Sequence, residues 1–320
     1  MKIAVLDDYL NVARGLADWG GLAEAEVVFF DAPLPADDAA RAKALAGFDV
    51  IVAMRERTPF DAGLLSRLPK LRLLVTTGLR NNAIDMAACR AQDVVVSGAP
   101  GHPDSVGATA ELTWALILAL FKNVPAEAAN MRAGLWQTAI PASVAGKRLG
   151  LVGLGNLGQR VARVGQAFGM DVVAWSPNLT DERAAQAGVQ RVDKQALFTS
   201  SDVVSLHLVL SERTAGVVDA EALAAMKPSA YLVNTARAGL ADHDALVRAL
   251  TGRLIAGAGL DVYPQEPLAA DDPLRRLDNV VLTPHLGYVT PSNFVAFYGN
   301  AVAAIAAWRR GEPIHVLNAA

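Results

Sequence analysis

Short runs of β-branched and aliphatic residues alternate with amphipathic helical stretches along the whole chain of 320 residues. This alternation is typical of βαβ units, in which helices join parallel strands and cover the sheet. Five runs lie in the first hundred residues, at 2–6, 26–30, 49–53, 72–75 and 94–96. Six more follow, at 148–152, 171–175, 202–208, 230–234, 255–260 and 279–283. The sequence therefore predicts an α/β protein with two doubly wound parallel-sheet domains.

A Gly/Pro-rich break at 97–105 separates the two series of strands and precedes a long apolar helix that begins near Val106. Because such a stretch interrupts regular structure, we expect a hinge and a domain boundary there. Residues 1–98 are predicted to form a smaller, flavodoxin-like domain, and residues 99–290 a Rossmann-type domain. The last helical stretch has no strand partner of its own, so residues 291–320 are expected to complete the first domain.

The clearest motif is a glycine-rich turn after the first strand of the second series. Gly153, Gly155 and Gly158 have G-x-G-x-x-G spacing, directly after a predicted strand and at the start of a predicted helix. The first glycine permits a tight turn, the second lets backbone N–H groups approach a pyrophosphate, and the third lets the helix pack close to the sheet. With Asn156 and Leu157 opening the helix, the motif predicts a binding site for a dinucleotide, NAD or NADP.

The residue that distinguishes NAD from NADP is expected at the end of the next strand, about 20 residues further on. That position is Ser176, so no carboxylate is available there to bind the ribose hydroxyls or to repel a 2′-phosphate. Pro177 and Asn178 follow and supply no adjacent arginine either. The preference between the two cofactors is therefore left open.

The net charge, the lengths of the apolar runs and the single cysteine argue against several other kinds of partner and location. A formal net charge of −3 gives no basic field for nucleic acid or for an anionic membrane. The apolar run at 112–121 is far shorter than the roughly 20 residues that span a bilayer, so it is interpreted as a core helix. The chain starts without a secretory signal, and its single cysteine, Cys89, excludes an internal disulfide. We therefore expect a cytoplasmic protein with a small-molecule ligand, and no cluster of residues has metal-ligand spacing.

Three polar segments lie at or just past strand ends of the second series: NTARAG (234–239), GLDVYPQEPL (259–268) and TPHLGYVT (283–290). Behind GLGNLG, in this order and spacing, they make the chain resemble the D-isomer-specific 2-hydroxyacid dehydrogenases over nearly its whole length. The resemblance implies an oxidoreductase that exchanges a hydride between NAD(P)(H) and a small 2-hydroxy or 2-keto acid, of the glyoxylate or hydroxypyruvate type.

By this resemblance, Arg237 binds the substrate carboxylate and polarises the carbonyl, His285 is the general acid in reduction and the base in oxidation, and Glu266 is the partner of His285. The chemistry asks for the same residue types. Hydride addition builds negative charge on the carbonyl oxygen, which a guanidinium and a proton donor stabilise. The planar fork of an arginine matches a carboxylate, and a histidine can give or take a proton near neutral pH.

The resemblance assigns further residues to the cofactor. Asp261 is expected to contact the nicotinamide carboxamide. The walls of the cofactor site are expected to include Leu208, Thr235, Ala236 and Gly287.

Substrate contacts are expected from the first domain. The family's substrate loop corresponds to 76–85, where the backbone N–H groups of Gly78 and Leu79 would hold the carboxylate. Arg80 stands where the family commonly has a second glycine, and it either reads an extra anionic group or points to solvent. Arg55 is the other basic candidate for substrate binding.

Members of this family pair as dimers through a helix and an arm that correspond here to 105–143, so the resemblance implies a homodimer. Trp136 is interpreted either as part of this arm or as an ordinary core tryptophan.

Three other functions remain to be compared. A formate dehydrogenase is disfavoured because those relatives carry a glutamine in place of Glu266. A 3-phosphoglycerate dehydrogenase is the main alternative, and an NAD(H)-sensing binding protein is the alternative of another class.

Overall fold

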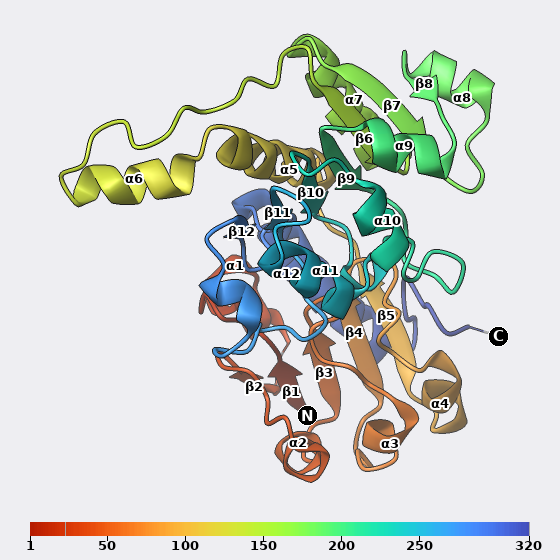
Figure 1. Cartoon of the computed structure of the whole chain (residues 1–320). Coiled ribbons are helices and arrows are strands. Elements are labelled where there is room, and N and C mark those ends of the chain that lie inside the picture. The colour runs from red at the N-terminus through yellow and green to blue at the C-terminus, as the bar shows by residue number, and fades with distance from the viewer. Residues whose placement is uncertain (23, 320) are drawn as a thin grey trace. The chain divides into compact units, whose positions relative to one another are not determined.

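The computed structural model describes residues 1–22 and 24–319, which form two compact units. The first unit consists of Met1–Ser105 and Thr290–Ala320, and the second consists of Val106–Val289. Each unit is built around a parallel sheet with helices on its faces, and the labelled elements can be followed in Figure 1. The predicted fold class, two doubly wound parallel-sheet domains, is confirmed.

The described strands of the first unit form a sheet in the order β2-β1-β3-β4-β5, which is the flavodoxin-like order. Its strands are β1 (Lys2–Val5), β2 (Glu26–Phe29), β3 (Val50–Ala53), β4 (Leu73–Thr77) and β5 (Val95–Ala99). Its helices are α1 (Ala13–Leu16), α2 (Asp38–Leu45), α3 (Ala62–Leu65), α4 (Met86–Ala91) and α12 (Pro291–Arg309). The central strands are buried along their whole length, as expected for a parallel sheet covered on both faces.

The C-terminal part of the chain completes the first unit. Tyr298 of α12 is 1% exposed, and its ring lies 6.3 Å from the ring of Trp19 near the start of the chain. Beyond α12 the chain runs antiparallel to β5, where the Leu317 N–H donates to the Val96 carbonyl at 2.8 Å. The Asn318 side chain adds two further bonds to the backbone of this edge, at 2.9 and 2.8 Å. Residues more than 200 positions apart thus share one sheet.

In the described part of the second unit the strand order is β12-β11-β10-β9-β6-β7-β8, which is the Rossmann order extended by one strand. The strands are β6 (Arg148–Val152), β7 (Asp171–Trp175), β8 (Gln190–Arg191), β9 (Val203–Leu206), β10 (Tyr231–Asn234), β11 (Gly257–Leu260) and β12 (Val280–Leu282). Six of these correspond to the six predicted runs. Strand β8 was not predicted because its two residues are polar and exposed, and so lack the apolar pattern of a buried strand.

The helices of the second unit cover both faces of its sheet. They are α5 (Ser105–Phe121), α6 (Val124–Arg132), α7 (Asn156–Ala167), α8 (Asp181–Gln186), α9 (Lys194–Ser200), α10 (Ala220–Ala225) and α11 (His243–Thr251). One core contains α5, α7 and the inward side chains of Leu149 and Leu151, and the other contains α9, α10, α11 and Val152. This alternation along β6 follows from the two-residue period of a strand.

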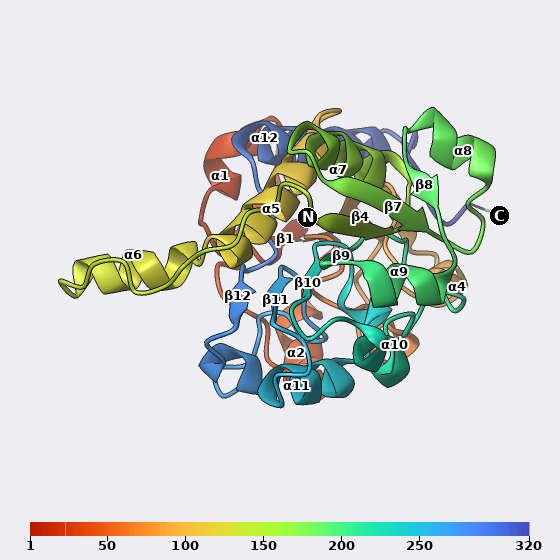
Figure 2. The same cartoon turned by 45° about the horizontal axis from the view of Figure 1, so that its top comes forward.

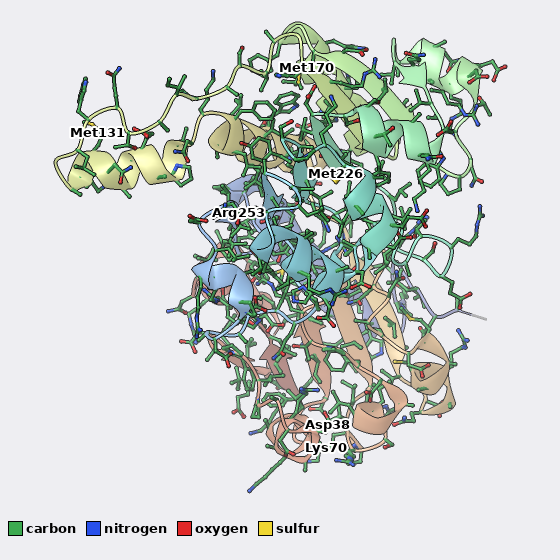
Figure 3. The ribbon with its side chains drawn as sticks, viewed as in Figure 1. Asp38, Lys70, Met131, Met170, Met226 and Arg253 are labelled. Atoms are coloured by element: carbon green, nitrogen blue, oxygen red, sulfur yellow. The ribbon has the colours of Figure 1, made fainter. Side chains whose placement is uncertain are left out.

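Helix α6 and the chain that follows it to residue 143 extend away from the rest of the second unit (Figures 1 and 2). No residue from 124 to 143 is buried, and Trp136 is 74% exposed, so the interpretation of Trp136 as a core residue is wrong. Met131 lies out on α6, whereas Met170 and Met226 are buried in the cores of the unit (Figure 3). The segment 124–143 therefore presents apolar side chains outside either core.

Helix α5, the apolar helix predicted near Val106, lies in the core with Trp114 and Ile117 almost fully buried. Taken singly, none of the described helices is long and apolar enough to cross a membrane. Helices α5 and α6 together meet that criterion of length and composition, with a 63° bend between them.

Candidate active site

The glycine turn begins directly after β6. Gly153 has φ +110°, and its N–H donates to the carbonyl of Trp175, the last residue of β7, at 2.8 Å. A Cβ at this position would lie 2.8 Å from the backbone carbonyl of His207. The left-handed conformation and the close approach of the chain after β9 both require glycine here.

The next two glycines shape the start of α7. Gly155 is the N-cap of α7 without a side-chain cap, and a Cβ there would have no neighbour within 4 Å. Gly158 is buried, and a Cβ would collide with the Gly153 carbonyl oxygen. The backbone N–H groups of Asn156 and Leu157 therefore open a helix whose N-terminus has space beside it and no side chain competing for its donors. These residues fit the pyrophosphate of a dinucleotide.

The other predicted cofactor residues follow strands that neighbour β6. The register pairs Val152 with Leu206 and Leu206 with Asn234, so β6, β9 and β10 end at one level of the sheet. Leu208 follows β9 and is half-buried, and Thr235 and Ala236 follow β10. The Thr235 hydroxyl lies 2.7 Å from the Thr113 hydroxyl of α5, and the Ala236 N–H donates to the Asn234 side chain at 3.0 Å. The structure brings these predicted residues to the same sheet edge as the glycine turn.

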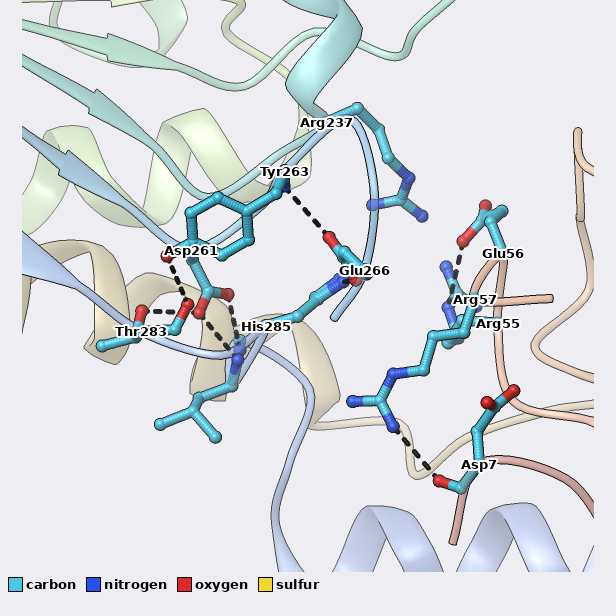
Figure 4. A network of polar contacts seen from close by, with 12 residues as sticks. Asp7, Arg55, Glu56, Arg57, Arg237, Asp261, Tyr263, Glu266, Thr283 and His285 are labelled. Atoms are coloured by element: carbon cyan, nitrogen blue, oxygen red, sulfur yellow. Dashed lines mark hydrogen bonds and ion pairs between the residues drawn. The ribbon is translucent and has the colours of Figure 1, made fainter. Parts of the chain in front are cut away.

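Strands β10, β11 and β12 carry the predicted catalytic residues at their carboxyl ends. His285 Nδ1 lies 2.6 Å from Glu266 Oε2, and the side chains are 12% and 17% exposed (Figure 4). The second oxygen, Glu266 Oε1, accepts the N–H of Tyr263 at 3.1 Å. The predicted pair is thus in direct contact, and the loop that carries Glu266 holds the carboxylate by its own backbone.

Arg237 follows β10 at the same end of the sheet and is half-buried. Its Nη1 donates to the Ala236 carbonyl at 2.7 Å, and its own carbonyl accepts the Asn234 side-chain amide at 3.0 Å. Both the backbone and the guanidinium of Arg237 are therefore anchored to the turn that follows β10.

Asp261 has a structural role that the motif did not predict. It is fully buried after β11, and it accepts hydrogen bonds from the Thr283 hydroxyl at 2.6 Å, the Leu286 N–H at 2.7 Å and the Gly287 N–H at 2.9 Å. Burial raises the pKa of Asp261, whereas these hydrogen bonds act to lower it. Asp261 therefore clamps the loop that carries His285 (Figure 4).

In the first unit, the predicted substrate residues lie after β3 and β4. Arg55 has φ 52°, and its Nη1 donates to the Thr77 carbonyl at 3.2 Å. The Gly78 N–H donates to the Ala99 carbonyl at 2.6 Å, so this N–H is bonded within the sheet and is not presented to a carboxylate as predicted. Gly78 instead makes room for Arg55, because a Cβ would collide with the Arg55 guanidinium. The side chains of Leu79 and Arg80 are exposed.

Other polar residues of the first unit were missed by the sequence analysis. The Asp7 carboxylate is buried beside this region and accepts hydrogen bonds from the Tyr9 hydroxyl at 2.8 Å and the Thr58 hydroxyl at 3.0 Å. Burial raises the pKa of Asp7, against the effect of these bonds. Arg57 Nη1 donates to the Asp7 carbonyl at 3.3 Å (Figure 4). An aspartate after a first strand carries no motif, so its sequence gave no signal of this contact.

Two further residues of the second unit were not assigned a role. His207 is buried next to the glycine turn, with Nε2 2.9 Å from the Ser205 hydroxyl. Burial lowers the pKa of His207 to about 3. Arg213, from the turn after β9, donates to the Asn178 side chain at 3.1 Å. The pairing could not be read from the sequence because 35 positions separate the two residues.

A Rossmann-ordered sheet with this glycine turn, and with a histidine–carboxylate pair and an arginine at the same edge, is the arrangement expected of a dinucleotide-binding domain with a proton donor and an anion-binding group beside the dinucleotide. Residues 114–287 match the family model described as D-isomer specific 2-hydroxyacid dehydrogenase, NAD binding domain. The chain belongs to this family of D-isomer-specific 2-hydroxyacid dehydrogenases, as the resemblance of its motifs predicted.

Several relatives are similar over most of the chain. A D-3-phosphoglycerate dehydrogenase of Mycobacterium bovis is 40% identical over 239 residues, which cover 74% of this chain and 45% of that protein. An (S)-sulfolactate dehydrogenase of Chromohalobacter salexigens is 38% identical over 266 residues, covering 82% and 85%. The crystal structure of a phosphoglycerate oxidoreductase from Vibrio cholerae superimposes with a TM-score of 0.90 at 37% identity, covering 97% and 99%. The chain spans about half the length of the mycobacterial relatives that it matches.

Proposed function

We propose that this protein is an NAD(P)-dependent 2-hydroxyacid dehydrogenase that interconverts a small 2-keto acid and the corresponding 2-hydroxy acid. The observation that carries the proposal is the 2.6 Å contact of His285 with Glu266, at the sheet edge where Arg237 follows the neighbouring strand. Membership of the family and the activities for which the relatives are named support the same reaction class.

The dinucleotide supplies or accepts the hydride when it is bound. Gly153, Gly155 and Gly158 give its pyrophosphate access to the first N–H groups of α7. Further along the same edge lie the residues expected to line the rest of the site: Ser176, Leu208, Thr235, Ala236, Asp261 and Gly287. The clamp formed by Asp261 keeps two backbone N–H groups of the last loop fixed.

His285 transfers the proton in both directions of the reaction. Because Nδ1 is held by Glu266, Nε2 is the ring atom that gives a proton to the carbonyl oxygen in reduction and takes it back in oxidation. The Glu266 carboxylate orients the ring and stabilises the imidazolium that forms in oxidation. Arg237 supplies a guanidinium that binds the substrate carboxylate and stabilises the negative charge on the reacting oxygen.

The proposed substrates are small 2-keto acids of the glyoxylate and hydroxypyruvate type, since a relative from Korarchaeum cryptofilum is named glyoxylate reductase. A second candidate reaction is the oxidation of 3-phosphoglycerate, favoured by the names of the mycobacterial and Vibrio relatives. In the first unit, Arg55, Leu79 and Arg80 are the proposed substrate contacts, with Gly78 supporting Arg55.

We further propose a cytoplasmic homodimer in which the segment 124–143 forms the pairing arm. This segment carries large apolar side chains that are more than half exposed: Val124, Met131, Leu135, Trp136 and Ile140. Contiguous exposed apolar side chains are typical of a surface that another protein covers.

The test follows NADH and NADPH by absorbance at 340 nm with glyoxylate, hydroxypyruvate and 3-phosphohydroxypyruvate. We expect oxidation of the cofactor by the wild type. The Arg237→Ala variant should lose at least ten-fold in kcat/KM, equivalent to about 1.4 kcal/mol of transition-state stabilisation, with nucleotide affinity changed less than three-fold. Arg253→Ala, at an exposed arginine that pairs with Asp278, is the matched control and should be unchanged. Tight binding of NAD(P)H without reduction of any 2-keto acid would favour the NAD(H)-sensing protein instead.

A further inference from the structure

We propose that Arg213 is a specificity-determining residue that binds the 2′-phosphate of NADP(H) and gives the protein a preference for NADP(H) over NAD(H). The inference rests on the proposed function, because it concerns the dinucleotide of that same site. Pro177 and Asn178 follow Ser176 directly, so no arginine is adjacent to it in the chain.

Ser176 lies beside the glycine turn, at the end of β7. Trp175 ends β7, pairs in register with Val152 of β6, and accepts the N–H of Gly153 at 2.8 Å. Ser176 is therefore one residue away from a direct contact with the glycine turn. In a Rossmann sheet the end of this second strand is where the adenosine ribose is read. Ser176 is half-buried and Pro177 beyond it is exposed, and neither side chain carries a charge.

Arg213 reaches the residues after Ser176 from the turn that follows β9. Strand β9 lies on the other side of β6 from β7, and the turn after it is fixed by the buried hydroxyl of Thr214. This hydroxyl donates to the Val209 carbonyl at 2.7 Å and accepts the Ser211 N–H at 2.8 Å. From this turn Arg213 Nη2 donates to Asn178 Oδ1 at 3.1 Å. The loops after β7 and β9 are thus joined, and the Arg213 guanidinium contacts the residue two positions beyond Ser176.

The positive charge of the Arg213 guanidinium is not neutralised by a carboxylate among the described ion pairs. The bond to Asn178 uses one of the five N–H donors of a guanidinium, and its acceptor is a neutral amide. Within the described residues, none of the ion pairs involves Arg213. Asp181, the first acidic residue after β7, is paired with Arg191 at 3.3 Å, and the exposed Glu212 is the neighbour of Arg213 in the chain.

This arrangement favours a phosphate over a ribose hydroxyl. A guanidinium gains strong charge-assisted hydrogen bonds from a phosphate, and no carboxylate follows β7 directly to repel one or to chelate the ribose diol of NAD(H). A competing explanation is that Arg213 only ties the two loops together. The two explanations differ in whether removal of Arg213 affects nucleotides with and without a 2′-phosphate equally.

The experiment measures binding by calorimetry, with adenosine 2′,5′-bisphosphate and 5′-AMP as probes of the full-length protein. We expect the wild type to bind the bisphosphate at least ten-fold more tightly than 5′-AMP. Arg213→Ala should weaken the bisphosphate at least ten-fold and leave 5′-AMP within about three-fold, whereas Asn178→Ala, which keeps the guanidinium, should weaken the bisphosphate less. Arg191→Ala is the matched control for an exposed arginine near the same strand end.

Three results would overturn the proposal: equal affinity of the wild type for the two nucleotides, no effect of Arg213→Ala on either, or an equal loss of both. The last would indicate a structural tie, and a lower melting temperature of the apoprotein would accompany it. A failure of the proposed function would look different, because the bisphosphate preference would persist in a protein that reduces no 2-keto acid.

Discussion

At the scale of single residues, His285 has a backbone conformation that is uncommon outside glycine, with φ 54°. Such a conformation costs about 1–2 kcal/mol, so the surrounding contacts must hold it. Asp261 binds the backbone of the next two residues, and Glu266 binds the ring. The catalytic geometry that we propose is therefore fixed by two carboxylates, one acting on the loop and the other on the side chain.

His207 gives a prediction for the pH dependence of stability. Burial lowers the pKa of the folded imidazole to about 3, so the imidazole stays neutral above this value. In the unfolded chain the imidazole takes up a proton as the pH falls through 6.5. The unfolded state then binds more protons, so stability falls as the pH is lowered through this window. Between pH 7.5 and 5.5, the free energy of unfolding of the wild type should fall by about 1.4 kcal/mol more than that of His207→Gln.

Urea unfolding of both proteins at the two pH values measures this difference, and contributions from other groups cancel in the comparison. Glutamine is chosen because its side-chain amide can replace Nε2 in the bond to Ser205. If the stability difference between the two proteins is the same at both pH values, His207 does not remain neutral when folded.

At the scale of elements, the start of α7 depends on close contact with the turn that precedes it. In Gly158→Ala the new Cβ meets the Gly153 carbonyl oxygen, which belongs to the backbone and cannot rotate away. We expect a loss of about 1–3 kcal/mol of stability and at least a ten-fold loss of NAD(P)H affinity, measured by urea unfolding and by fluorescence titration.

A matched control exists in α12, where a Cβ at Gly299 would have no neighbour within 4 Å. Gly299→Ala should stabilise the protein by about 0.5–1 kcal/mol, because alanine loses less backbone entropy in a helix than glycine. Equal effects of the two substitutions would mean that the turn at Gly158 can relax, contrary to the contact described.

At the scale of the whole molecule, the first unit depends on the end of the chain. Asn318 is 7% exposed; its Oδ1 accepts the Val96 N–H, and its Nδ2 donates to the Val94 carbonyl. Asn318→Ala leaves both backbone groups without this partner, at a cost of about 1–3 kcal/mol each if water does not replace it. Amide hydrogen exchange should accelerate in β5 and leave β10 of the second unit unchanged.

Asn130→Ala is the control for this prediction, because the Asn130 side chain bonds to Thr138 in the exposed segment 124–143. It should alter protection in neither sheet. Faster exchange in β10 after Asn318→Ala would show that the two units unfold together rather than separately.

The fold could be predicted from the sequence because strand burial and helix packing impose regular apolar patterns on neighbouring residues. The turn from Gly153 to Gly158 was also readable, since positive φ and close backbone approach restrict these positions to glycine. Arg237, Glu266 and His285 were named from the order and spacing of motifs, and the register of β10, β11 and β12 puts their segments at one edge. Strand β8 escaped because two polar, exposed residues carry no such pattern.

Contacts between residues that are far apart in the chain were decided only by the tertiary structure. The sequence by itself determined which residues are apolar, which positions need glycine and which side chains can bind an anion or move a proton. It did not determine that Arg213 reaches Asn178, that Asp261 clamps the loop of His285, or that the Gly78 N–H is bonded to Ala99. Each of these bonds depends on where the folded sheets bring together loops that are far apart in the chain, whereas patterns and propensities express only the local energies of neighbouring residues.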